Sequence, residues 1–270
     1  MKKQLKQNKK DEAATNHQPS AISSKKVPWG PGMAVLYAVA IYFAAQIIAS
    51  LLVIIYPHLR GWSRQHAMGW LNTAVTAQFW YVLFAEALTV GAVWWFVHKR
   101  KSSLRAIGWR RPEWMGVVYA LAGFFVYFVV YAVLLSIATH LFPSLNVNQK
   151  QQLGFNNATG TINLWLAFVS LVVLPPLAEE TVFRGFVFTG LRNRFTPVWA
   201  AVITSVLFAS AHLEFGSGQP LLWVAAIDTF TLSLVLCYLR QKTDSLWPGI
   251  FLHALKNGIA FTSLFLLHVH

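Results

Sequence analysis

Residues 33–56 read MAVLYAVAIYFAAQIIASLLVIIY, an apolar run that Pro57 closes. About 20 consecutive apolar residues suffice for a helix to cross the hydrocarbon core of a bilayer. Similar runs recur along the chain, so we expect an all-α fold, a polytopic membrane helical bundle. Charged residues make up only 11% of the sequence, whereas a soluble domain carries about 25%. The composition therefore also indicates a membrane protein.

The apolar runs predict seven membrane spans, or eight if a re-entrant segment is added. The expected spans lie at about 33–56, 74–97, 115–141, from 162 to a turn at 194–197, 198–213, 220–239 and 248–268. They form one transmembrane domain over residues 31–270, which follows a lysine-rich tail at residues 1–30. Because that tail is polar and basic, we expect it to be disordered.

The basic residues predict the orientation of the chain. The net charge is +13, but the positive charges fall between the apolar runs rather than on one face, which argues against a nucleic-acid partner. With the N-terminus in the cytoplasm, nearly all of them, including Arg240 and Lys242 in the loop before the last span, lie on the cytoplasmic side. We therefore expect a multi-pass protein of the cell membrane, with the lipid bilayer as a partner. Cys237 is the only cysteine, so no internal disulfide is possible.

Four acidic residues lie inside the expected spans, where charge is costly. Glu86 and Asp228 are each alone in a span, and a hydrogen bond or ion pair is the simpler explanation for them. Glu179 and Glu180 are adjacent, and packing alone does not explain such a pair. Neighbours on a helix point about 100° apart, so the two carboxylates should have different roles. Arg184 follows Glu180 at the i, i+4 spacing of an ion pair, which leaves Glu179 as the freer group.

Two histidines in later spans complete the candidate set. His212 lies four residues after Phe208, and His253 lies four residues before Asn257, so each pair shares a helical face. A lone histidine in a span is most often a hydrogen-bonding core residue, but two at fixed spacings beside a Glu-Glu pair favour a site. Glu179 and His212 are almost equally far from the turn at 194–197. In an antiparallel hairpin they should therefore lie at the same height and could face each other.

The three patterns resemble the CPBP family, and they appear in the family's order. They are Glu179-Glu180-x-x-x-Arg184, Phe208-x-x-x-His212 and His253-x-x-x-Asn257. The family comprises CAAX prenyl endopeptidases that cleave after prenylcysteine and their bacterial relatives, also called the Abi or bacteriocin self-immunity family. The resemblance implies an intramembrane protease with a catalytic core at about residues 162–268. Its substrates would be membrane-associated, including lipidated, peptides or proteins.

The resemblance also implies roles for the matching residues. Glu179 would work with His212 to activate a water molecule, and His253 with Asn257 would stabilise the oxyanion. Glu180 and Arg184 would hold the site in shape, and Phe208 would pack it. Oxyanion donors are effective in a dry cavity because a low dielectric strengthens their interaction with developing charge.

A metal remains an open alternative for this site. The family has been classed as metalloprotease, and Glu179, His212 and His253 could bind a zinc ion with one open position. No HExxH pattern is present, however. A metal-free, glutamate-type mechanism needs fewer assumptions, and we favour it.

Two other functions compete with the endopeptidase. A non-catalytic bacteriocin self-immunity or membrane scaffold protein would keep its effect after substitution of the motif residues. A proton-coupled transporter could use Glu86, Asp228 and the histidines as a relay. The sequence shows no inverted repeat of the kind such transporters carry, which argues against the second.

Overall fold

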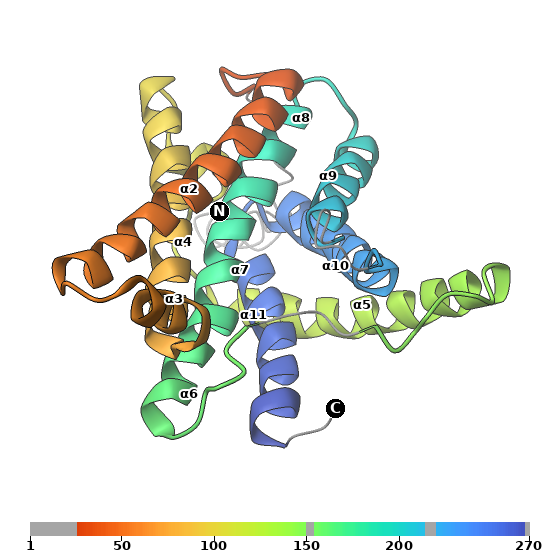
Figure 1. The fold of residues 1–270 in the computed structure, drawn as a ribbon. Helices are drawn as coiled ribbons and strands as arrows, with labels where there is room; N and C mark the ends of the chain where they lie inside the picture. The colour runs from red at the N-terminus through yellow and green to blue at the C-terminus, as the bar shows by residue number, and fades with distance from the viewer. Residues whose placement is uncertain (1–25, 150–153, 214–219, 268–270) are drawn as a thin grey trace, which may run out of the picture.

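The computed structural model describes residues 26–149, 154–213 and 220–267, and all regular structure within these ranges is helical (Figure 1). Among them, six helical segments are long and apolar enough to cross a membrane: Pro31–Leu59, Val75–Lys99, Trp114–Leu141, Thr161–Leu191, Trp223–Thr243 and Trp247–Leu266. The fifth expected span is a shorter apolar helix, Pro197–Ala211. The predicted polytopic helical bundle is therefore confirmed, and the described helices lie at the expected positions.

Several of these segments are divided into shorter elements. The elements are α2 (Pro31–Leu59), α3 (Arg64–Thr73), α4 (Val75–Lys99), the 3₁₀ turn η1 (Leu104–Ile107), α5 (Trp114–Leu141), α6 (Thr161–Phe168), the π-helix η2 (Val169–Val173), α7 (Leu174–Glu179), the π-helix η3 (Glu180–Val187), α8 (Phe188–Leu191), α9 (Pro197–Ala211), α10 (Trp223–Thr243), α11 (Trp247–Phe261) and the π-helix η4 (Thr262–Leu266). The predicted turn before α9 is confirmed, since the Thr196 side chain caps the helix by accepting from the N–H of Trp199.

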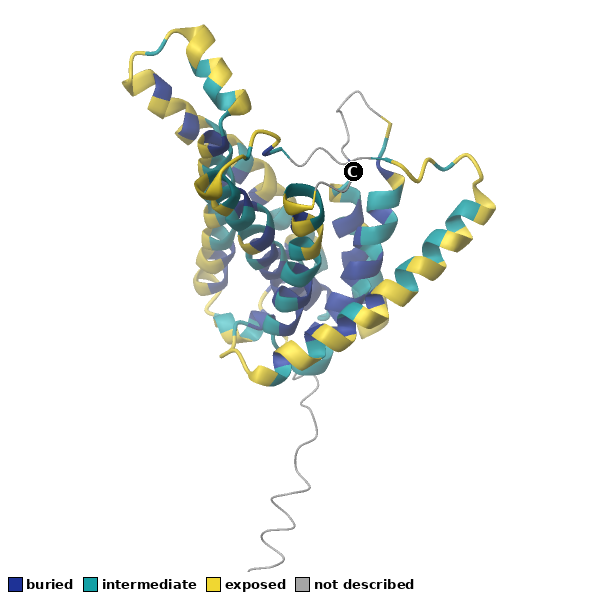
Figure 2. Cartoon of the chain, turned by 90° about the horizontal axis from the view of Figure 1, so that it is seen from below, coloured by how far each residue is buried: buried dark blue, intermediate teal, exposed yellow. Residues whose placement is uncertain are grey.

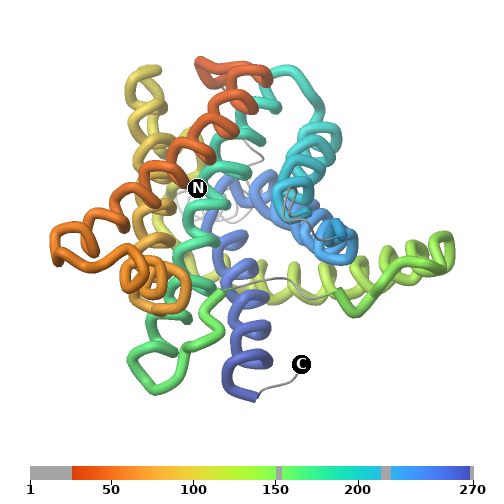
Figure 3. Tube along the Cα trace, viewed as in Figure 1, coloured from red at the N-terminus to blue at the C-terminus, as the bar shows by residue number. Residues whose placement is uncertain are grey.

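Small residues let the first two long helices pack closely. α2 packs along α4, as the tube in Figure 3 shows. The buried positions of α2 include Ala45 and Ala49, and those of α4 include Ala77 and Ala85. Lipid is as apolar as leucine, so membrane helices associate through close backbone approach at such small side chains. Large apolar side chains of α2 face outward instead, among them Leu36 and Phe43.

Helix α5 joins the bundle along only its first half. Its buried residues are Gly116, Ala120, Gly123 and Tyr127, and no residue from 128 to 141 is buried. A Cβ atom on Gly123 would lie 2.8 Å from the Leu252 side chain, so glycine permits the close contact with α11. Figure 2 shows the later half of α5 diverging from α10 and α11, with exposed and half-buried residues only.

A fully buried arginine ties the loop after α4 to the end of α10. Arg240 donates to the Asp244 carboxylate at 2.7 Å and to the carbonyl oxygen of Ala106 at 3.3 Å. Asp244 also accepts from Arg110, which is partly exposed. Gly108 has φ +92°, and a Cβ atom there would lie 2.7 Å from Nε of Arg240, so the turn needs glycine. The expectation that Arg240 and Lys242 lie in a loop is wrong, because α10 extends to Thr243. Arg240 can be buried there since its charge is paired with Asp244 four residues later.

Only residues 26–30 of the expected tail lie within the described residues. Residues 1–25 lie outside them, so the prediction of disorder and of the cytoplasmic side is untested there. From residue 26 onward the chain packs on the bundle, and Val27 and Trp29 are buried. The Asn193 side-chain amide donates to the carbonyl oxygens of both residues. Trp29 also stacks on Phe186 of η3, which attaches this segment directly to the helix that carries the glutamate pair.

Candidate active site

The fourth span, which carries the glutamate pair, is interrupted at the site. Pro175 and Pro176 have no N–H group, and the carbonyl oxygen of Leu171 would need one of these two as its α-helical or π-helical donor. The side-chain amide of Asn257 in α11 supplies the missing donor, with 3.0 Å between its Nδ2 atom and that oxygen. The π-helix η2 precedes the prolines, and η3 begins at Glu180. Such π-turns are frequent at functional sites because they re-aim side chains along a helix.

Glu180 is a buried carboxylate that joins η3 to α11. Its side chain is 1% exposed, and its Oε1 atom accepts from Arg184 at 2.9 Å, which is the predicted i, i+4 pair. Its Oε2 atom lies against α11, where a Cβ atom on Gly249 would approach it to 2.8 Å. Glycine at position 249 therefore makes room for the carboxylate. Gly249 lies one turn before His253, so both residues are on the same face of α11, and Glu180 contacts that face.

His253 lies between the two adjacent carboxylates. Its Nδ1 atom is 3.3 Å from Oε1 of Glu180, and its Nε2 atom is 3.7 Å from Oε2 of Glu179. The imidazole is only 6% exposed. Nδ1 carries a hydrogen in the tautomer that donates a hydrogen bond to the Glu180 carboxylate. This hydrogen bond orients the ring and directs Nε2 toward Glu179. Glu180 thus acts behind the histidine, as carboxylates often do where a histidine works as an acid or base.

Glu179 is the glutamate of the pair that another molecule can reach. Its side chain is 26% exposed, and its buried Oε2 atom has no hydrogen-bond partner. The Oε2 atom of Glu180 also has none, but that side chain is only 1% exposed and lies against Gly249. A buried carboxylate oxygen without a donor is costly unless another molecule satisfies it. An oxygen atom placed about 2.8 Å from both Glu179 Oε2 and His253 Nε2 would be within hydrogen-bond distance of each. The expectation that the two glutamates divide their roles agrees with this geometry.

Phe208 packs the site between two histidines and the arginine. The Arg184 guanidinium lies over its ring at 4.4 Å from the centroid. The His212 ring centroid is 4.7 Å from that of Phe208, and the His253 centroid is 6.0 Å away. Phe208 is fully buried, as expected for a packing residue. His212 caps α9, and its Nδ1 atom donates to the Phe208 carbonyl oxygen at 2.8 Å, which leaves Nε2 free to accept.

The structure does not join every pair that the sequence suggested. Glu179 contacts His253, but no hydrogen bond or ion pair joins it to His212 among the described residues. A straight hairpin would have brought Glu179 and His212 together. The two π-helices change the rotation along the fourth span, and α9 packs mainly on α10. The pairing of Glu179 with His212 stays a prediction from the resemblance. For Glu86 the sequence favoured a hydrogen bond or an ion pair, and no such contact is present among the described residues; its carboxyl group is close enough to Glu179 for the two charges to repel.

The proposed zinc ligands do not form one group here. In the part of the chain that is described, no cluster of three or more His, Cys, Asp or Glu side chains is arranged to hold a metal ion. Glu179 and His253 approach each other, but His212 is held by the Phe208 carbonyl and has no polar contact with either. The arrangement of these residues therefore does not support the alternative zinc site. Whether the protein uses a metal is a question for chelation experiments.

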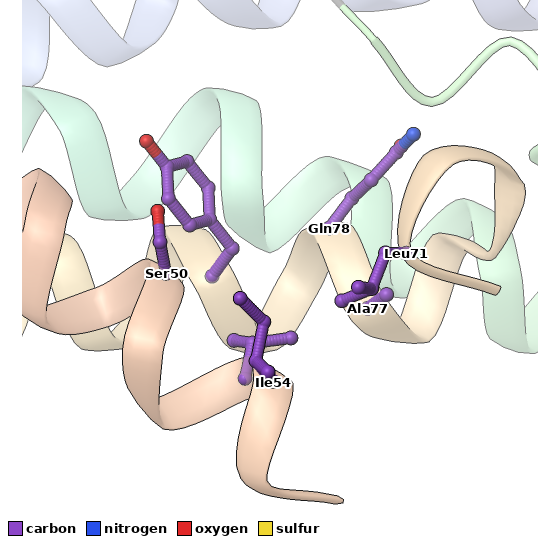
Figure 4. A pocket seen from close by; sticks show the side chains of 7 residues that line it. Ser50, Ile54, Leu71, Ala77 and Gln78 are labelled. Carbon is purple, nitrogen blue, oxygen red and sulfur yellow. The ribbon is translucent and has the colours of Figure 1, made fainter. Parts of the chain in front are cut away.

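A pocket elsewhere carries no catalytic group. It has a volume of about 250 Å³ and lies between α2, α3 and α4 (Figure 4). Its lining residues are Ser50, Val53, Ile54, Leu71, Ala77, Gln78 and Tyr81. Tyr81 donates to Gln46, and Gln78 accepts from the N–H of Phe155 at 2.7 Å. These polar groups are used within the protein, so they support packing rather than chemistry.

Comparison with known proteins connects this geometry with proteolysis. Residues 161–259 match the family model described as type II CAAX prenyl endopeptidase Rce1-like. The match includes all seven residues singled out from the sequence. It confirms the resemblance to this protease family over that part of the chain.

Two curated proteins are also similar to this chain. A "Putative membrane peptidase YdiL" of Bacillus subtilis (strain 168) is 26% identical over 143 residues, which cover 53% of this chain and 54% of the relative. An "Uncharacterized 24.3 kDa protein" of Escherichia coli is 34% identical over 100 residues, 36% of this chain and 44% of the relative. The chain thus spans about half the length of the curated relatives it matches. No solved structure matches it.

Proposed function

We propose that this protein is an intramembrane endopeptidase of the CAAX-protease type, which hydrolyses membrane-associated peptides with a glutamate-activated water molecule. The observation that carries the proposal is the buried Oε2 atom of Glu179, which lacks a hydrogen-bond partner and lies 3.7 Å from Nε2 of His253. The family match over residues 161–259 and the name of the Bacillus relative support the reaction class.

The reaction begins with a water molecule held between Glu179 and His253. Glu179 takes a proton from the water as its oxygen attacks the carbonyl carbon of the scissile peptide bond. A positioned general base of this kind contributes about 10²–10⁴-fold to the rate. The tetrahedral intermediate then expels the amine as its C–N bond breaks. Glu179 returns the proton to the leaving nitrogen, so the products are a carboxylic acid and an amine.

The surrounding residues have supporting roles in this proposal. Glu180 and Arg184 fix the ring of His253, and Phe208 keeps both histidines in place. Asn257 uses one amide hydrogen on Leu171, and its second hydrogen is available to the oxyanion. His212 can accept a hydrogen bond through Nε2, which suits a second contact to the attacking water. The contact with Glu179 itself is made by His253.

A reconstituted cleavage screen tests the proposal. The purified chain in liposomes would be given membrane-anchored peptides, some with a farnesylated cysteine near the C-terminus and some with a plain transmembrane anchor. Products would be identified by mass spectrometry. We expect one or more peptides to be cut, and the His253→Gln variant to cut them at least 100-fold more slowly.

A chelator arm and a histidine comparison sharpen the screen. Cleavage that persists in excess chelator supports the metal-free mechanism, and its loss, with recovery on adding zinc, supports the metal. His212→Gln should be slowed less than His253→Gln. If neither histidine variant changes the cleavage rate, the assigned site is wrong. If no peptide is cut, a non-catalytic immunity or scaffold role becomes the better explanation.

A further inference from the structure

Outside the assigned site, three polar side chains from three helices meet inside the expected spans. Nζ of Lys256 in α11 lies 2.6 Å from Oδ2 of Asp228 in α10, and the hydroxyl of Tyr127 in α5 donates to Oδ1 of the same carboxylate. Asp228 and Lys256 are 20% and 23% exposed. Charges at such positions are costly and require partners. The sequence favoured a hydrogen bond or an ion pair for Asp228; it makes both and is therefore the meeting point of α5, α10 and α11.

The lysine belongs to the same turn of α11 as two site residues. His253 contacts Glu180, Lys256 contacts Asp228, and Asn257 donates to the carbonyl oxygen of Leu171. At about 100° per residue, Lys256 lies about 60° to one side of His253 around the helix, and Asn257 about 40° to the other side. This side of α11 is thus held by polar contacts to three elements, η3, α10 and η2. Of the three contacts, only the one made by Lys256 lies outside the catalytic set.

The contact also lies far along the helices from the connection between α10 and α11. The connection at residues 244–246 ties α10 to α11 at one end, and the ion pair ties the two helices again farther along. The buried seam of α5 ends at Tyr127, beyond which the helix diverges from the bundle (Figure 2). Apolar contacts alone permit a helix to rotate or slide in lipid, because its outer face is equally well solvated in each position. A directional polar contact removes that freedom.

We propose that the Asp228–Lys256 pair, held by Tyr127, is a positioning element that fixes the rotation of α11 and so the place of His253 relative to Glu179. The inference rests on the proposed function. Lys256 and Asp228 touch no reacting atom, and they act through the helix. A displacement of the imidazole by about 1 Å can cost about 100-fold in rate, so a contact one turn away affects catalysis.

Neutral and charge-swapped pairs test positioning separately from stability. Asp228→Asn combined with Lys256→Met removes both charges and leaves neither one unpaired. Replacing both partners of an ion pair together, even of a buried one, is often close to neutral for stability. Asp228→Lys combined with Lys256→Asp restores the pair with its polarity reversed, and Tyr127 can donate or accept. Lys242→Met is the matched control, because Lys242 is a half-buried α10 lysine whose contacts are aromatic rings and the Tyr238 hydroxyl.

Cleavage kinetics in liposomes and the thermal midpoint would be measured for all variants. The neutral pair should lower kcat at least tenfold, with little change in KM and a midpoint close to that of the wild type. The swapped pair should return kcat to within about threefold, and Lys242→Met should match the wild type. A neutral pair with wild-type kcat, or a swapped pair as slow as the neutral one, would overturn the proposal.

A spectroscopic readout keeps the test independent of the proposed activity. In protein labelled with ¹⁵N-histidine, the His253 ring signals are identified by their loss in His253→Gln. They should shift in the neutral pair and return toward the wild-type position in the swapped pair. If the wild type cleaves no peptide, the endopeptidase proposal fails, and this readout alone decides the positioning. Signals that stay unchanged in the neutral pair would refute it.

Discussion

Two buried arginines in this chain have the same local arrangement and different surroundings. Arg184 pairs with Glu180 four residues earlier, and Arg240 pairs with Asp244 four residues later. Asp244 also pairs with a second arginine, Arg110, so both of its carboxylate oxygens are used to connect the loop after α4 to the end of α10. Glu180 instead contacts His253, whose far side faces Glu179. The i, i+4 charge pair is therefore no mark of function by itself. What distinguishes the site is the chain of contacts that leads from the pair to an unpartnered carboxylate oxygen.

The largest stability effect should follow from Glu180→Gln. The substitution leaves Arg184 buried without a counter-charge, and breaking a buried pair in this way costs about 3–5 kcal/mol. Chemical or thermal unfolding in detergent would measure the loss. A variant with wild-type stability would show that the carboxylate does not neutralise Arg184, and it would remove the basis for comparing the two arginines.

Asp244→Asn should destabilise the protein by about 3 kcal/mol and leave the chemistry intact. Arg240 keeps its bond to the Ala106 carbonyl, but it loses its charged partner, as does Arg110. At a temperature where the variant stays folded, kcat for peptide cleavage should equal that of the wild type. A kcat reduced tenfold in fully folded protein would mean that the two arginine pairs are functionally equivalent after all.

Asn257→Ala should cost about 1–3 kcal/mol, because the Leu171 carbonyl oxygen loses its donor. Adding Pro175→Ala restores an N–H group one turn after that oxygen, and the stability should partly recover. Activity separates the two roles of Asn257. If the amide also donates to the oxyanion, the double variant regains stability and stays slow. Full recovery of the cleavage rate would leave Asn257 with a structural role only.

Gly249→Ala should have the smallest effect of this series, about 1–2 kcal/mol of stability, because the added methyl group presses on Oε2 of Glu180. Since that carboxylate contacts His253, kcat should also fall. Gly258→Ala in the same helix is the matched control, because its nearest neighbour is the Val172 side chain at 3.6 Å, an ordinary contact. Equal kcat values for the two variants would indicate that Glu180 can shift without consequence for the histidine.

The sequence predicted those features that depend on composition or on regular helical spacing. Apolar length predicted the spans, and four-residue spacing predicted the Glu180–Arg184 pair. The packing role of Phe208 came from the family resemblance. The same spacing joins Arg240 to Asp244, but a charged stretch between two spans favoured a loop there. Regular spacing also failed where the helix is irregular. The π-helices around Pro175 and Pro176 altered the expected facing of Glu179 and His212.

Contacts between distant segments had weaker signals. The absence of N–H groups at Pro175 and Pro176 marks an unpartnered carbonyl, but it does not identify Asn257 as its donor. Gly249 could have been noticed, since it lies one turn before His253 on the same face. Nothing in the sequence indicated that a carboxylate fills the space it leaves. Lys256 and Asp228 were both visible as charges within spans, and only the packing of α10 on α11 joins them.

Steady-state cleavage by Glu179→Gln in liposomes tests the central claim most directly. The side chain keeps its size and loses the ability to accept a proton. Within the described ranges, its one ion-pair contact is with His253 at 3.7 Å. We predict a thermal midpoint close to that of the wild type and a kcat at least 100-fold lower. The Asp244→Asn variant should show the opposite, a lower stability with an unchanged kcat. A folded Glu179→Gln protein that cuts the same peptides at the wild-type rate would contradict the assignment of Glu179 as the catalytic carboxylate.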